Sequence, residues 1–599
     1  MPATNGDDVL GTTYEGETLD GLAGDDALES AFNKTTLLGS GGDDTLTTVF
    51  LPDELRDEAT SASQYGGAGN DRLYAELGTY DIEGPVEGEQ VFASIYQNGG
   101  IGDDVIEARL SDYAFSRGLL SAEIHGGAGN DTITALSSLE TFAHEVMNSI
   151  YGDGGDDTIT ALAVTSFFSD SDSATNLIYG GFGNDVIEAT TRGISNGGDY
   201  LLNSLYGGLG NDSLTAISYS NSNSGSQTVV NQVFGEQGND YLAALFTSSG
   251  ADTGADVTVT LDGGNGHDVL LAQTETALEF GGYAAIAHTM IGGDGRDEMT
   301  STISTEWSDY FNLTVDQSGG AGADILSSMI EVSDENGFYG GSTANNRLTG
   351  DDGGDTLSGA ITLNVYELSS SLDVQNDFSG GSGNDTIDAA LTVVFSLDSY
   401  APEGTYDIGV NLLAGDDGND TLSGSVAVEN NLTDATFTGH SELYGGDGHD
   451  RLTVTGGTGN ILDGGTGNDT LVGGDGEDRL IGGEGFDTLT GGLGADTFVF
   501  NVIETGYRRD IVTDFSSGTD TIALAIDAFT SLSSYGLGIL DTEALSYGST
   551  ASSADDYLFY DADTGTLYYD ADGTGVEART TLAVFTDAPS LLADDIYLI

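Results

Sequence analysis

The stretch GGTGNDTLVGGDGEDRLIGGEGFDTLTGGLGADTFVF, residues 464–500, repeats itself every nine residues. Four copies begin at Gly464, Gly473, Gly482 and Gly491, and each reads G-G-x-G-x-D-x-U-x, in which U is a large apolar residue. Glycine tolerates backbone conformations that other residues avoid, and a buried carboxylate is costly unless something neutralises it. The repeat therefore predicts tight turns, each with an aspartate at place six that faces a cation.

The same frame, G-x-x-G-x-D, continues towards the N-terminus at a longer spacing. Its first glycine falls at Gly21, Gly39, Gly66, Gly99, Gly126, Gly152, Gly180, Gly207, Gly235, Gly263, Gly292, Gly319, Gly350, Gly380, Gly415 and Gly445. Successive copies between Gly99 and Gly319 lie 26 to 29 residues apart. A nearly constant period over so many copies indicates one structural coil per period.

The tandem of residues 464–499 resembles the calcium-binding RTX repeats, also called haemolysin-type repeats. Four consecutive copies make this resemblance specific, and the longer-period copies extend it back to about residue 21. The resemblance implies an all-β fold: a parallel β-roll or β-helix solenoid with calcium-binding turns and a C-terminal β cap. Calcium takes six to eight oxygen ligands, so a neighbouring turn must complete each site, and binding and stacking become one event.

The candidate calcium ligands are the place-six aspartates and the turn glycines of the tandem. The aspartates are Asp26, Asp44, Asp71, Asp104, Asp131, Asp157, Asp185, Asp212, Asp240, Asp268, Asp297, Asp324, Asp355, Asp385, Asp420, Asp450, Asp469, Asp478, Asp487 and Asp496. The glycines are Gly464, Gly465, Gly467, Gly473, Gly474, Gly476, Gly482, Gly483 and Gly485. The alternative is that these are ordinary turn aspartates, which are common in loops. Weak or absent sites are expected at GGSTAN (340–345) and at GGTGNI (456–461), which ends in Ile461.

Strand-like sequence flanks each turn. MNSIYG (147–152) leads into one turn, and DTITALSS (131–138) follows another. We expect a coil with one calcium turn, one strand, a polar second turn and a returning strand, so that calcium lines one edge; two-sided rolls and three-sided helices both fit. Two ladders support the stacking: Asn148, Asn176, Asn203 and Asn231, and Tyr151, Tyr179, Tyr206 and Phe234. The aromatic ladder fits packing, with a carbohydrate-stacking strip as the alternative.

The period divides the chain into four predicted regions. Residues 1–65 form an N-terminal cap with the first turns, 66–455 the long-coil solenoid, 456–500 the tandem roll and 501–599 a C-terminal β cap. The hairpin text YLFYDADTGTLYYDADGTG, with Asp561, Asp563, Asp570 and Asp572, fits either another calcium site or a merely acidic hairpin. The final LLADDIYLI resembles the uncleaved C-terminal signals of type I secretion, and the N-terminus lacks the features of a cleaved signal.

Composition restricts the function further. The formal net charge is −86, with 99 acidic residues against 13 Lys and Arg in 599 residues, so the chain would repel nucleic acid and anionic lipid. Cysteine is absent, which excludes disulfides and thiolate metal sites, and no apolar run is long enough for a membrane span. The expected partners are calcium ions, the type I secretion machinery during export and, as a further possibility, glycans. The expected location is outside the cell or on the surface of a Gram-negative-type bacterium.

No catalytic motif is found in the sequence. The nearest text to HExxH is HEVMN (144–148), which lacks the second histidine, and no GxSxG is present. His267 and His449 fall at place five of the repeat, which we expect to tolerate any residue. The leading hypothesis is a non-enzymatic, secreted calcium-binding protein with a structural, adhesive or surface role. The alternative is a carbohydrate-active β-helix enzyme, a lyase or epimerase of uronate polysaccharides.

Overall fold

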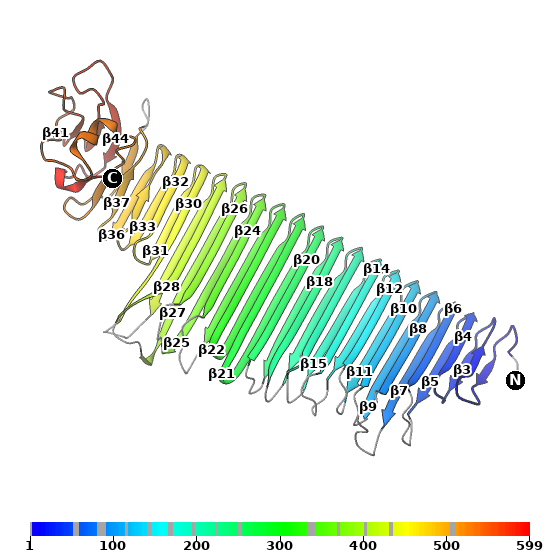
Figure 1. Ribbon diagram of the computed structural model, residues 1–599. Helices are drawn as coiled ribbons and strands as arrows, with labels where there is room; N and C mark the ends of the chain where they lie inside the picture. The colour runs from blue at the N-terminus through cyan, green and yellow to red at the C-terminus, as the bar shows by residue number, and fades with distance from the viewer. Residues whose placement is uncertain are drawn as a thin grey trace. The chain divides into compact units, whose positions relative to one another are not determined.

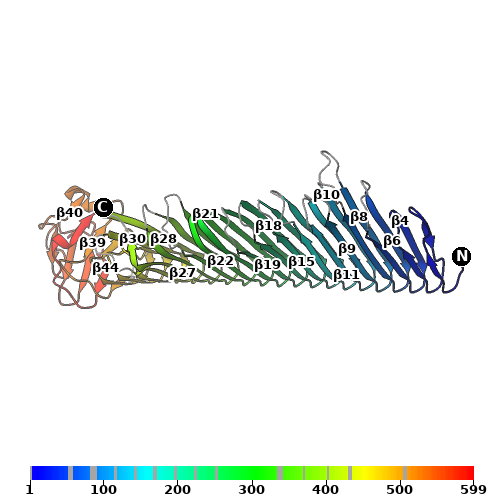
Figure 2. The same cartoon turned by 90° about the horizontal axis from the view of Figure 1, so that it is seen from below.

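A computed structural model gives the fold, drawn in Figure 1. It describes residues 3–51, 59–80, 91–113, 118–139, 145–165, 172–194, 198–221, 225–249, 254–333, 342–367, 372–400, 404–429, 435–503 and 509–599. The chain divides into two units, Met1–Gln317 with Glu331–Asn336, and Ser318–Ile330 with Gly337–Ile599. Within each unit, parallel strands stack one coil after another (Figure 2).

In the first unit, even-numbered strands precede the glycine turns and odd-numbered strands follow them. The even strands are β2 (Thr18–Asp20), β4 (Thr35–Gly41), β6 (Thr60–Ala68), β8 (Val91–Ile101), β10 (Gly118–Ala128), β12 (Glu145–Gly154), β14 (Ser173–Phe182), β16 (Tyr200–Leu209), β18 (Ser226–Gln237) and β20 (Gly254–Asn265). The odd strands are β1 (Val9–Gly11), β3 (Ala27–Ser30), β5 (Thr45–Phe50), β7 (Arg72–Tyr80), β9 (Val105–Tyr113), β11 (Thr132–Leu139), β13 (Thr158–Val164), β15 (Val186–Gly193), β17 (Ser213–Ser220) and β19 (Tyr241–Ser249). Two longer elements follow, β21 (Val269–Asp294) and β22 (Glu298–Ala321).

Within the described residues, each long coil has two strands, as a two-sided roll would have. Strand β11 pairs in parallel with β9 and β13, so that Ile133 lies between Ile106 and Ile159. Strand β10 pairs in the same way with β8 and β12. β21 belongs to both sheets, because its first part pairs with β19 and its second part with β20. The predicted glycine turn with a strand before it and a strand after it is confirmed, whereas the polar second turn lies outside the described residues in most coils.

The second unit begins with the same two-stranded coil and then narrows. Its long-coil strands are β23 (Ile325–Ser333), β24 (Thr343–Asp352), β25 (Thr356–Glu367), β26 (Asp373–Ser382), β27 (Thr386–Tyr400), β28 (Gly404–Asp417), β29 (Thr421–Glu429), β30 (Ala435–Gly448) and β31 (Arg451–Gly456). The tandem strands are β32 (Ile461–Gly467), β33 (Thr470–Asp475), β34 (Arg479–Ile481), β35 (Glu484–Gly485), β36 (Thr488–Leu493) and β37 (Thr497–Phe500). Here Thr470 pairs with Thr488, so one coil takes two nonapeptides.

The C-terminal residues continue the stack with strands taken out of chain order. The elements are β38 (Asp510–Val512), β39 (Thr521–Leu524), the 3₁₀ helix η1 (Thr530–Tyr535), β40 (Gly538–Ile539), β41 (Leu545–Tyr547), β42 (Leu558–Asp561), β43 (Thr566–Tyr569), β44 (Thr580–Phe585), η2 (Ala593–Asp595) and β45 (Ile596–Leu598). β38 pairs with β44, and β39 pairs with β45, both in parallel. The last residues of the chain therefore form a strand in which Ile596 and Leu598 are buried.

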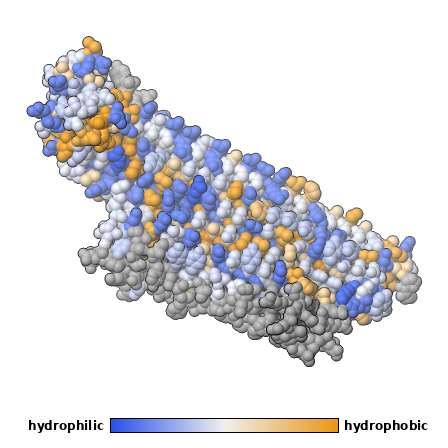
Figure 3. Space-filling model, viewed as in Figure 1, coloured by the Kyte–Doolittle hydropathy of each residue, from blue (hydrophilic) through white to orange (hydrophobic). Residues whose placement is uncertain are grey.

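The hydrophobic core lies between the two strands of each coil. Side chains alternate along a strand, so the U residue two places after each aspartate points inward. Ile133, Leu471 and Leu480 are each 0% exposed, as the repeat predicts. The outward residues are mostly small and polar, and Figure 3 shows hydrophilic residues along the edge at which the glycine turns lie. The fold therefore places the predicted ligands in columns along that edge.

Candidate calcium-binding edge

Each turn of the edge depends on glycine at fixed places. In the turn 126–131, Gly127 and Gly129 have φ of 109° and 136°, a region that L side chains rarely adopt. A Cβ on Gly129 would also collide with the backbone of Gly102 in the preceding coil. The tandem glycines follow the same rule, since Gly465, Gly467, Gly474, Gly476, Gly483 and Gly485 all have positive φ. These glycines let successive turns lie directly on one another.

The place-six aspartates form buried columns that connect one coil to the next. All of the predicted aspartates, from Asp26 to Asp496, are between 1% and 3% exposed. The backbone N–H of Asp104 donates to Oδ1 of Asp131, and the N–H of Asp131 donates to Oδ1 of Asp157, both at 2.7 Å. The same bond recurs along both units, for example from Asp240 to Asp268 and from Asp355 to Asp385. One carboxylate oxygen of each aspartate thus joins two coils.

The second carboxylate oxygen lies in a cradle lined by oxygen atoms. For most of the column, including Asp131, Asp240 and Asp478, Oδ2 is buried and has no hydrogen-bond partner among the described residues. The cradle is the space where the place-one glycine lacks a Cβ. A Cβ on Gly473 would lie 2.6 Å from Oδ2 of Asp478 and 2.6 Å from the carbonyl oxygen of Gly491 in the next coil.

These features fit calcium. A buried, unpartnered carboxylate oxygen beside a backbone carbonyl of the neighbouring coil is an arrangement that a hard cation satisfies. Within the described residues, no group of three or more Asp, Glu or His side chains surrounds a common point. Each site would therefore take much of its ligand shell from backbone carbonyls, and glycine at place one keeps the carbonyl and the carboxylate accessible to the same ion.

Without a cation, these carboxyls are electrostatically strained. Burial raises the pKa of Asp71 to about 7, and neighbouring carboxylates of Asp104 and Asp44 act in the same direction. Burial also raises the pKa of Asp157 to about 8 and that of Asp478 to about 7. The hydrogen bond from the neighbouring coil opposes these shifts without cancelling them. At neutral pH the column therefore either holds protons or carries closely spaced negative charges, and a divalent ion relieves both.

Place five forms a second, more exposed column that the sequence analysis missed. The N–H of Asn130 donates to Oδ1 of Asp103, and the N–H of Asp156 donates to Oδ1 of Asn130. These hydrogen bonds run in the opposite direction to those of the buried column. Each place-five side chain accepts from the backbone N–H of the following coil, whereas each place-six carboxylate accepts from the preceding coil. His267 and His449 belong to this column, and Nδ1 of His267 accepts from the N–H of Arg296 at 2.7 Å. Place five also holds Arg296 and Phe486, which join the column only through their backbone N–H, so the expectation that it tolerates any residue stays a prediction.

The tandem differs from the long coils because aspartates occupy both of its edges. Asp450, Asp469 and Asp487 form one column, with bonds of 2.8 Å, and Asp478 and Asp496 form the other. The second column begins with Asn460, whose amide donates to Oδ1 of Asp478 at 2.7 Å. Ile461 pairs with Arg479, the residue after Asp478, so Asn460 lies in register with Asp478. The frame GGTGNI, which put Ile461 at place six, is therefore off by one residue.

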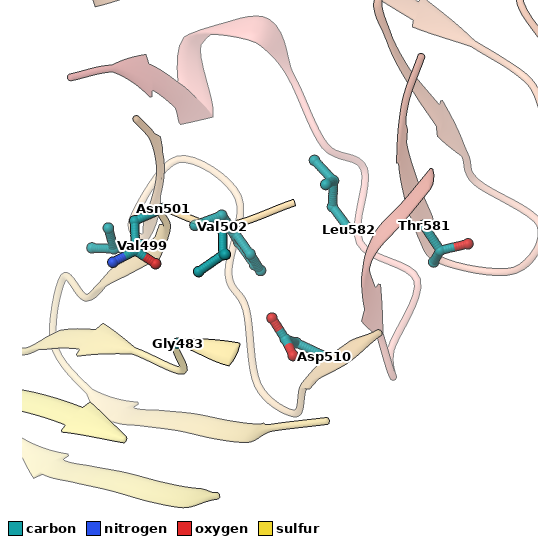
Figure 4. A pocket seen from close by; sticks show the side chains of 8 residues that line it. Gly483, Val499, Asn501, Val502, Asp510, Thr581 and Leu582 are labelled. Carbon is teal, nitrogen blue, oxygen red and sulfur yellow. The ribbon is translucent and has the colours of Figure 1, made fainter. Parts of the chain in front are cut away.

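The two tandem columns extend into the C-terminal region through Asp510 and Asp520, which the repeat frame did not identify. Asp487 donates its N–H to Oδ1 of Asp510, and Asp496 donates to Oδ1 of Asp520, both at 3.1 Å. Figure 4 shows Asp510 near Gly483 and opposite the chain that carries Thr581 and Leu582. These residues line a cavity of about 10 Å³, room for a single water molecule. The full G-x-x-G-x-D frame precedes neither aspartate, although Gly518 stands at place four before Asp520 with φ of 80°.

Two other predicted features lie away from the edge. Of GGSTAN, only residues 342–345 are among the described residues, and they lead into β24 rather than into a glycine turn of the column. In the hairpin of β42 and β43, the Asp563 N–H donates to Oδ1 of Asp561, and Oδ2 of Asp572 accepts from the N–H of Val576 at 2.8 Å. An acidic hairpin with internal hydrogen bonds is what the structure describes there, and a calcium site at this position stays a prediction.

The asparagine ladder lies in the interior of the coils. Nδ2 of Asn176 donates to Oδ1 of Asn203 at 2.9 Å, and Asn203 donates to Asn231 at 3.0 Å. All three are 0% exposed. A second ladder of this kind, Asn346, Asn376 and Asn411, lies in the other unit. These amides replace apolar contacts with a continuous hydrogen-bonded line that fixes the register of the coils.

The aromatic ladder is a packing feature. Tyr151 and Tyr179 stack with centroids 5.2 Å apart and an interplanar angle of 2°, and Tyr179 and Tyr206 stack at 4.6 Å and 9°. Phe234 and His125 extend the stack at its two ends. Because each ring face is covered by the next ring, only edges and hydroxyls meet solvent. A sugar that needs an open ring face has little to stack on here, which disfavours the carbohydrate-strip interpretation.

Comparison with known protein families identifies the repeat. A family model for the RTX calcium-binding nonapeptide repeat matches residues 65–81, 123–137, 148–163, 171–190, 202–216, 375–390, 406–426, 454–489 and 472–501. The chain carries RTX calcium-binding repeats. These RTX segments contain column aspartates of both units, such as Asp71, Asp131 and Asp478.

The other comparisons add little to the RTX assignment. No curated protein matches the chain. The family model describes a calcium-binding repeat, which agrees with the oxygen-lined cradles, and not a catalytic domain. Among the described residues, no helix has the length and apolar composition that a membrane span requires. His144, the first residue of the HExxH-like text, lies outside the described residues.

Proposed function

We propose that this is a secreted RTX protein that folds when it binds calcium outside the cell and then serves as a structural, adhesive or surface component. The place-six aspartates and the turn glycines act as ligands, and each ion bridges two successive coils. One observation carries the proposal: a buried, unpartnered Oδ2 beside the next coil's glycine carbonyl, repeated from coil to coil, as at Asp240 and Asp478.

Export explains why such a fold would depend on calcium. Extracellular sites of this class typically bind calcium with dissociation constants of about 10⁻⁴–10⁻³ M, so they stay empty in a cytosol. A chain with a net charge of −86 then repels itself and remains unfolded. The C-terminal LLADDIYLI acts as an uncleaved type I secretion signal while the chain is unfolded, and its Ile596–Leu598 segment becomes strand β45 after export from a Gram-negative-type cell.

The test is a calcium titration of the purified chain, followed by circular dichroism and small-angle X-ray scattering. We expect an expanded chain with little strand content in chelator and a compact, strand-rich chain at about 1 mM calcium, with full reversal by EGTA. Export is tested separately, by expressing the chain with and without residues 591–599 beside a type I secretion system. A chain that stays compact in EGTA, or leaves the cell equally well without these residues, contradicts the corresponding part of the proposal.

The enzymatic alternative has its own assay. The calcium-loaded chain is incubated with uronate polysaccharides, and unsaturated or epimerised products are measured. The proposal expects none, because the repeated edge is built from carboxylates that a cation occupies rather than from a general base facing a groove. Turnover would replace the structural role with a catalytic one while leaving calcium-dependent folding intact.

A further inference from the structure

A shallow groove on the outer face of the first unit is distinct from the calcium edge. It has a volume of about 390 Å³ and crosses four neighbouring strands that follow the glycine turns, β13, β15, β17 and β19. Arg192 and Thr190 of β15 line it, together with Tyr219 of β17 and Thr247 of β19. Its volume lies within the range of about 300–1,000 Å³ that is typical of ligand sites.

Arg192 is the chemical centre of this groove. It is exposed and forms no ion pair with a carboxylate in the part of the chain that the structure describes, although the chain has 99 acidic residues and 13 Lys and Arg. Arg109, on the same sheet, instead pairs with Glu107 and lies over the ring of Tyr74. An exposed arginine without an ion-pair partner among the described residues can contact an external anion, and its planar fork suits a carboxylate.

The strands beside Arg192 are uncharged and rich in hydrogen-bonding groups, and the carboxylate of Asp199 is buried behind groove-lining Gly193. Strands β13 and β17, on either side of β15, carry no charged residue. Tyr219 pairs in register with Arg192, and its side chain is 45% exposed. Asn221 also borders the groove, as does Ser220, which is 2% exposed and whose hydroxyl has no hydrogen-bond partner among the described residues. One cation, one aromatic ring and several amide and hydroxyl groups match a carboxylated sugar better than a phosphate, which favours several cations.

We propose that this groove binds a uronate unit of an acidic polysaccharide, with Arg192 on the carboxylate and Tyr219, Thr190, Asn221 and Thr247 around the sugar ring and its hydroxyls. The groove runs across strands of successive coils, so a linear glycan could extend along the sheet. This inference rests on the proposed surface or matrix role and names the partner chemistry for it.

The net negative charge of the chain does not prevent this interaction. At physiological ionic strength, charges further away than about 8 Å are largely screened. The nearest acidic residue on β15 is Glu188, four residues from Arg192 along an extended strand. Strand geometry separates their Cα atoms by roughly 13 Å. Calcium on the edge further reduces the repulsion. The carboxylate of Asp199, which lies beside Gly193, is buried and accepts a hydrogen bond from the Thr165 hydroxyl, so Arg192 is the exposed charge of the groove.

The experiment measures binding of a glucuronate disaccharide to the full, calcium-loaded chain by titration calorimetry. The short acid limits calcium bridging by the sugar itself, and its methyl ester serves as the uncharged probe. We expect the acid to bind the parent chain, with affinity lowered about tenfold or more in Arg192→Gln and for the methyl ester. Tyr219→Ala should also weaken binding. Arg72→Gln, an exposed arginine of β7 outside the groove, removes the same charge and should leave affinity unchanged.

Three outcomes would overturn the groove proposal: no binding of the acid to the folded parent chain, equal affinity of the acid and its ester, or equal affinity of Arg192→Gln and Arg72→Gln. Circular dichroism on the same samples separates this failure from a failure of the calcium proposal. A chain that folds with calcium and does not bind the acid overturns only the groove, whereas a chain with unchanged strand content in EGTA overturns only the calcium role.

Discussion

The tandem coils and the long coils both stack in parallel, but they differ in how much of the stabilisation comes from the aspartate columns and how much from the buried interior. A tandem coil of two nonapeptides buries little more than its two U residues, such as Leu471 and Leu480, between columns of aspartates on both edges. A long coil has its place-six aspartate on one edge only, although buried Asp172 and Asp199 lie at the other edge of two coils. The interior of one long coil holds Ile159, Ala161, Ala163 and the Asn176 amide. The tandem therefore depends more on cations, and the long coils more on their interior.

The largest expected effect is the response of the calcium-free chain to pH. Burial raises the folded-state pKa of Asp71 and Asp478 to about 7, above the ordinary 3.8 of an unfolded chain. The calcium-free fold then binds protons more tightly than the unfolded chain, so its stability is greatest at low pH and is lost as pH rises through about 7. In EGTA, we expect strand content to increase between about pH 7.5 and about pH 5.5, above the pI of about 4.1.

Calcium should make this pH profile nearly flat. The tandem has two column carboxyls per coil, so hydrogen exchange should show a steeper pH dependence for residues 461–500 than for β6 to β19. Strand content that rises with pH in EGTA would contradict the sign of the effect. An equal pH dependence in both regions would contradict the comparison.

The next largest effect is expected from a methyl group at place one. In Gly152→Ala, the new Cβ would meet Oδ2 of Asp157 and lie 2.5 Å from the carbonyl oxygen of Gly180. We expect a loss of about 3 kcal/mol or more in the free energy of unfolding, together with a lost calcium ion. Gly154→Ala, in the same turn, has nothing closer than 3.9 Å and is the matched control. Urea unfolding with calcium measures both variants, and equal losses would contradict the cradle.

Removal of one column carboxylate should affect calcium binding more in the tandem than in the long coils. Asp478→Asn and Asp157→Asn each remove one charged ligand, which should weaken local calcium binding on the order of tenfold. The rise in the calcium midpoint, followed by hydrogen exchange of peptides around each site, should be larger in the tandem. Asp156→Asn is the control, because Asn130 and Asn184 already occupy that exposed column. A midpoint shift in this control equal to that of Asp157→Asn would contradict the assignment of ligands.

The buried asparagine ladder should contribute to the stability of the long coils and not to that of the tandem. Asn203→Ala removes one buried hydrogen bond from Asn176 and one from Asn231, which should cost about 1–3 kcal/mol, although the two amides keep their bonds to the Thr190 carbonyl and the Ser218 hydroxyl. The calcium midpoint of the tandem should not change. Thermal unfolding of the calcium-loaded chain measures the cost, and a change below experimental error would show that the ladder contributes nothing to stability.

The smallest expected effect is an increase in the stability of the long coils. Glu236 occupies place two with φ of 73°, where many turns have glycine and a few others, such as those of Asp153 and Asp351, share the strained conformation. Glu236→Gly relieves the left-handed strain and should stabilise the long coils by about 0.5–1 kcal/mol, without changing calcium stoichiometry. A destabilised variant would show that the Glu236 side chain makes contacts that outweigh the strain.

Much of this arrangement is visible in the sequence because the solenoid places equivalent residues at equal intervals. The frame of Gly126 and Asp131 predicts the turn, and the U residues predict the core. Place five was missed because Asp103, Asn130 and His267 differ chemically while sharing one role, that of a hydrogen-bond acceptor.

Other features were missed because they depend on register and not on a local motif. Asp510 and Asp520 follow longer intervals without the full glycine frame, and Asn460 is displaced by one residue from the frame. The groove at Arg192 arises only when four strands from different coils lie side by side. Spacing alone does not reveal such neighbours, since the loops between strands differ in length.

The most direct test of calcium as the bridge between coils is hydrogen exchange of the place-six backbone amides. The amides of Asp104, Asp131 and Asp157 donate to carboxylates of the next coil, and a bridging ion would hold these carboxylates in place. With about 1 mM calcium at neutral pH, we predict strong protection of peptides that contain these amides, and exchange near the unfolded rate after transfer to EGTA. Equal protection in calcium and in EGTA would contradict the account.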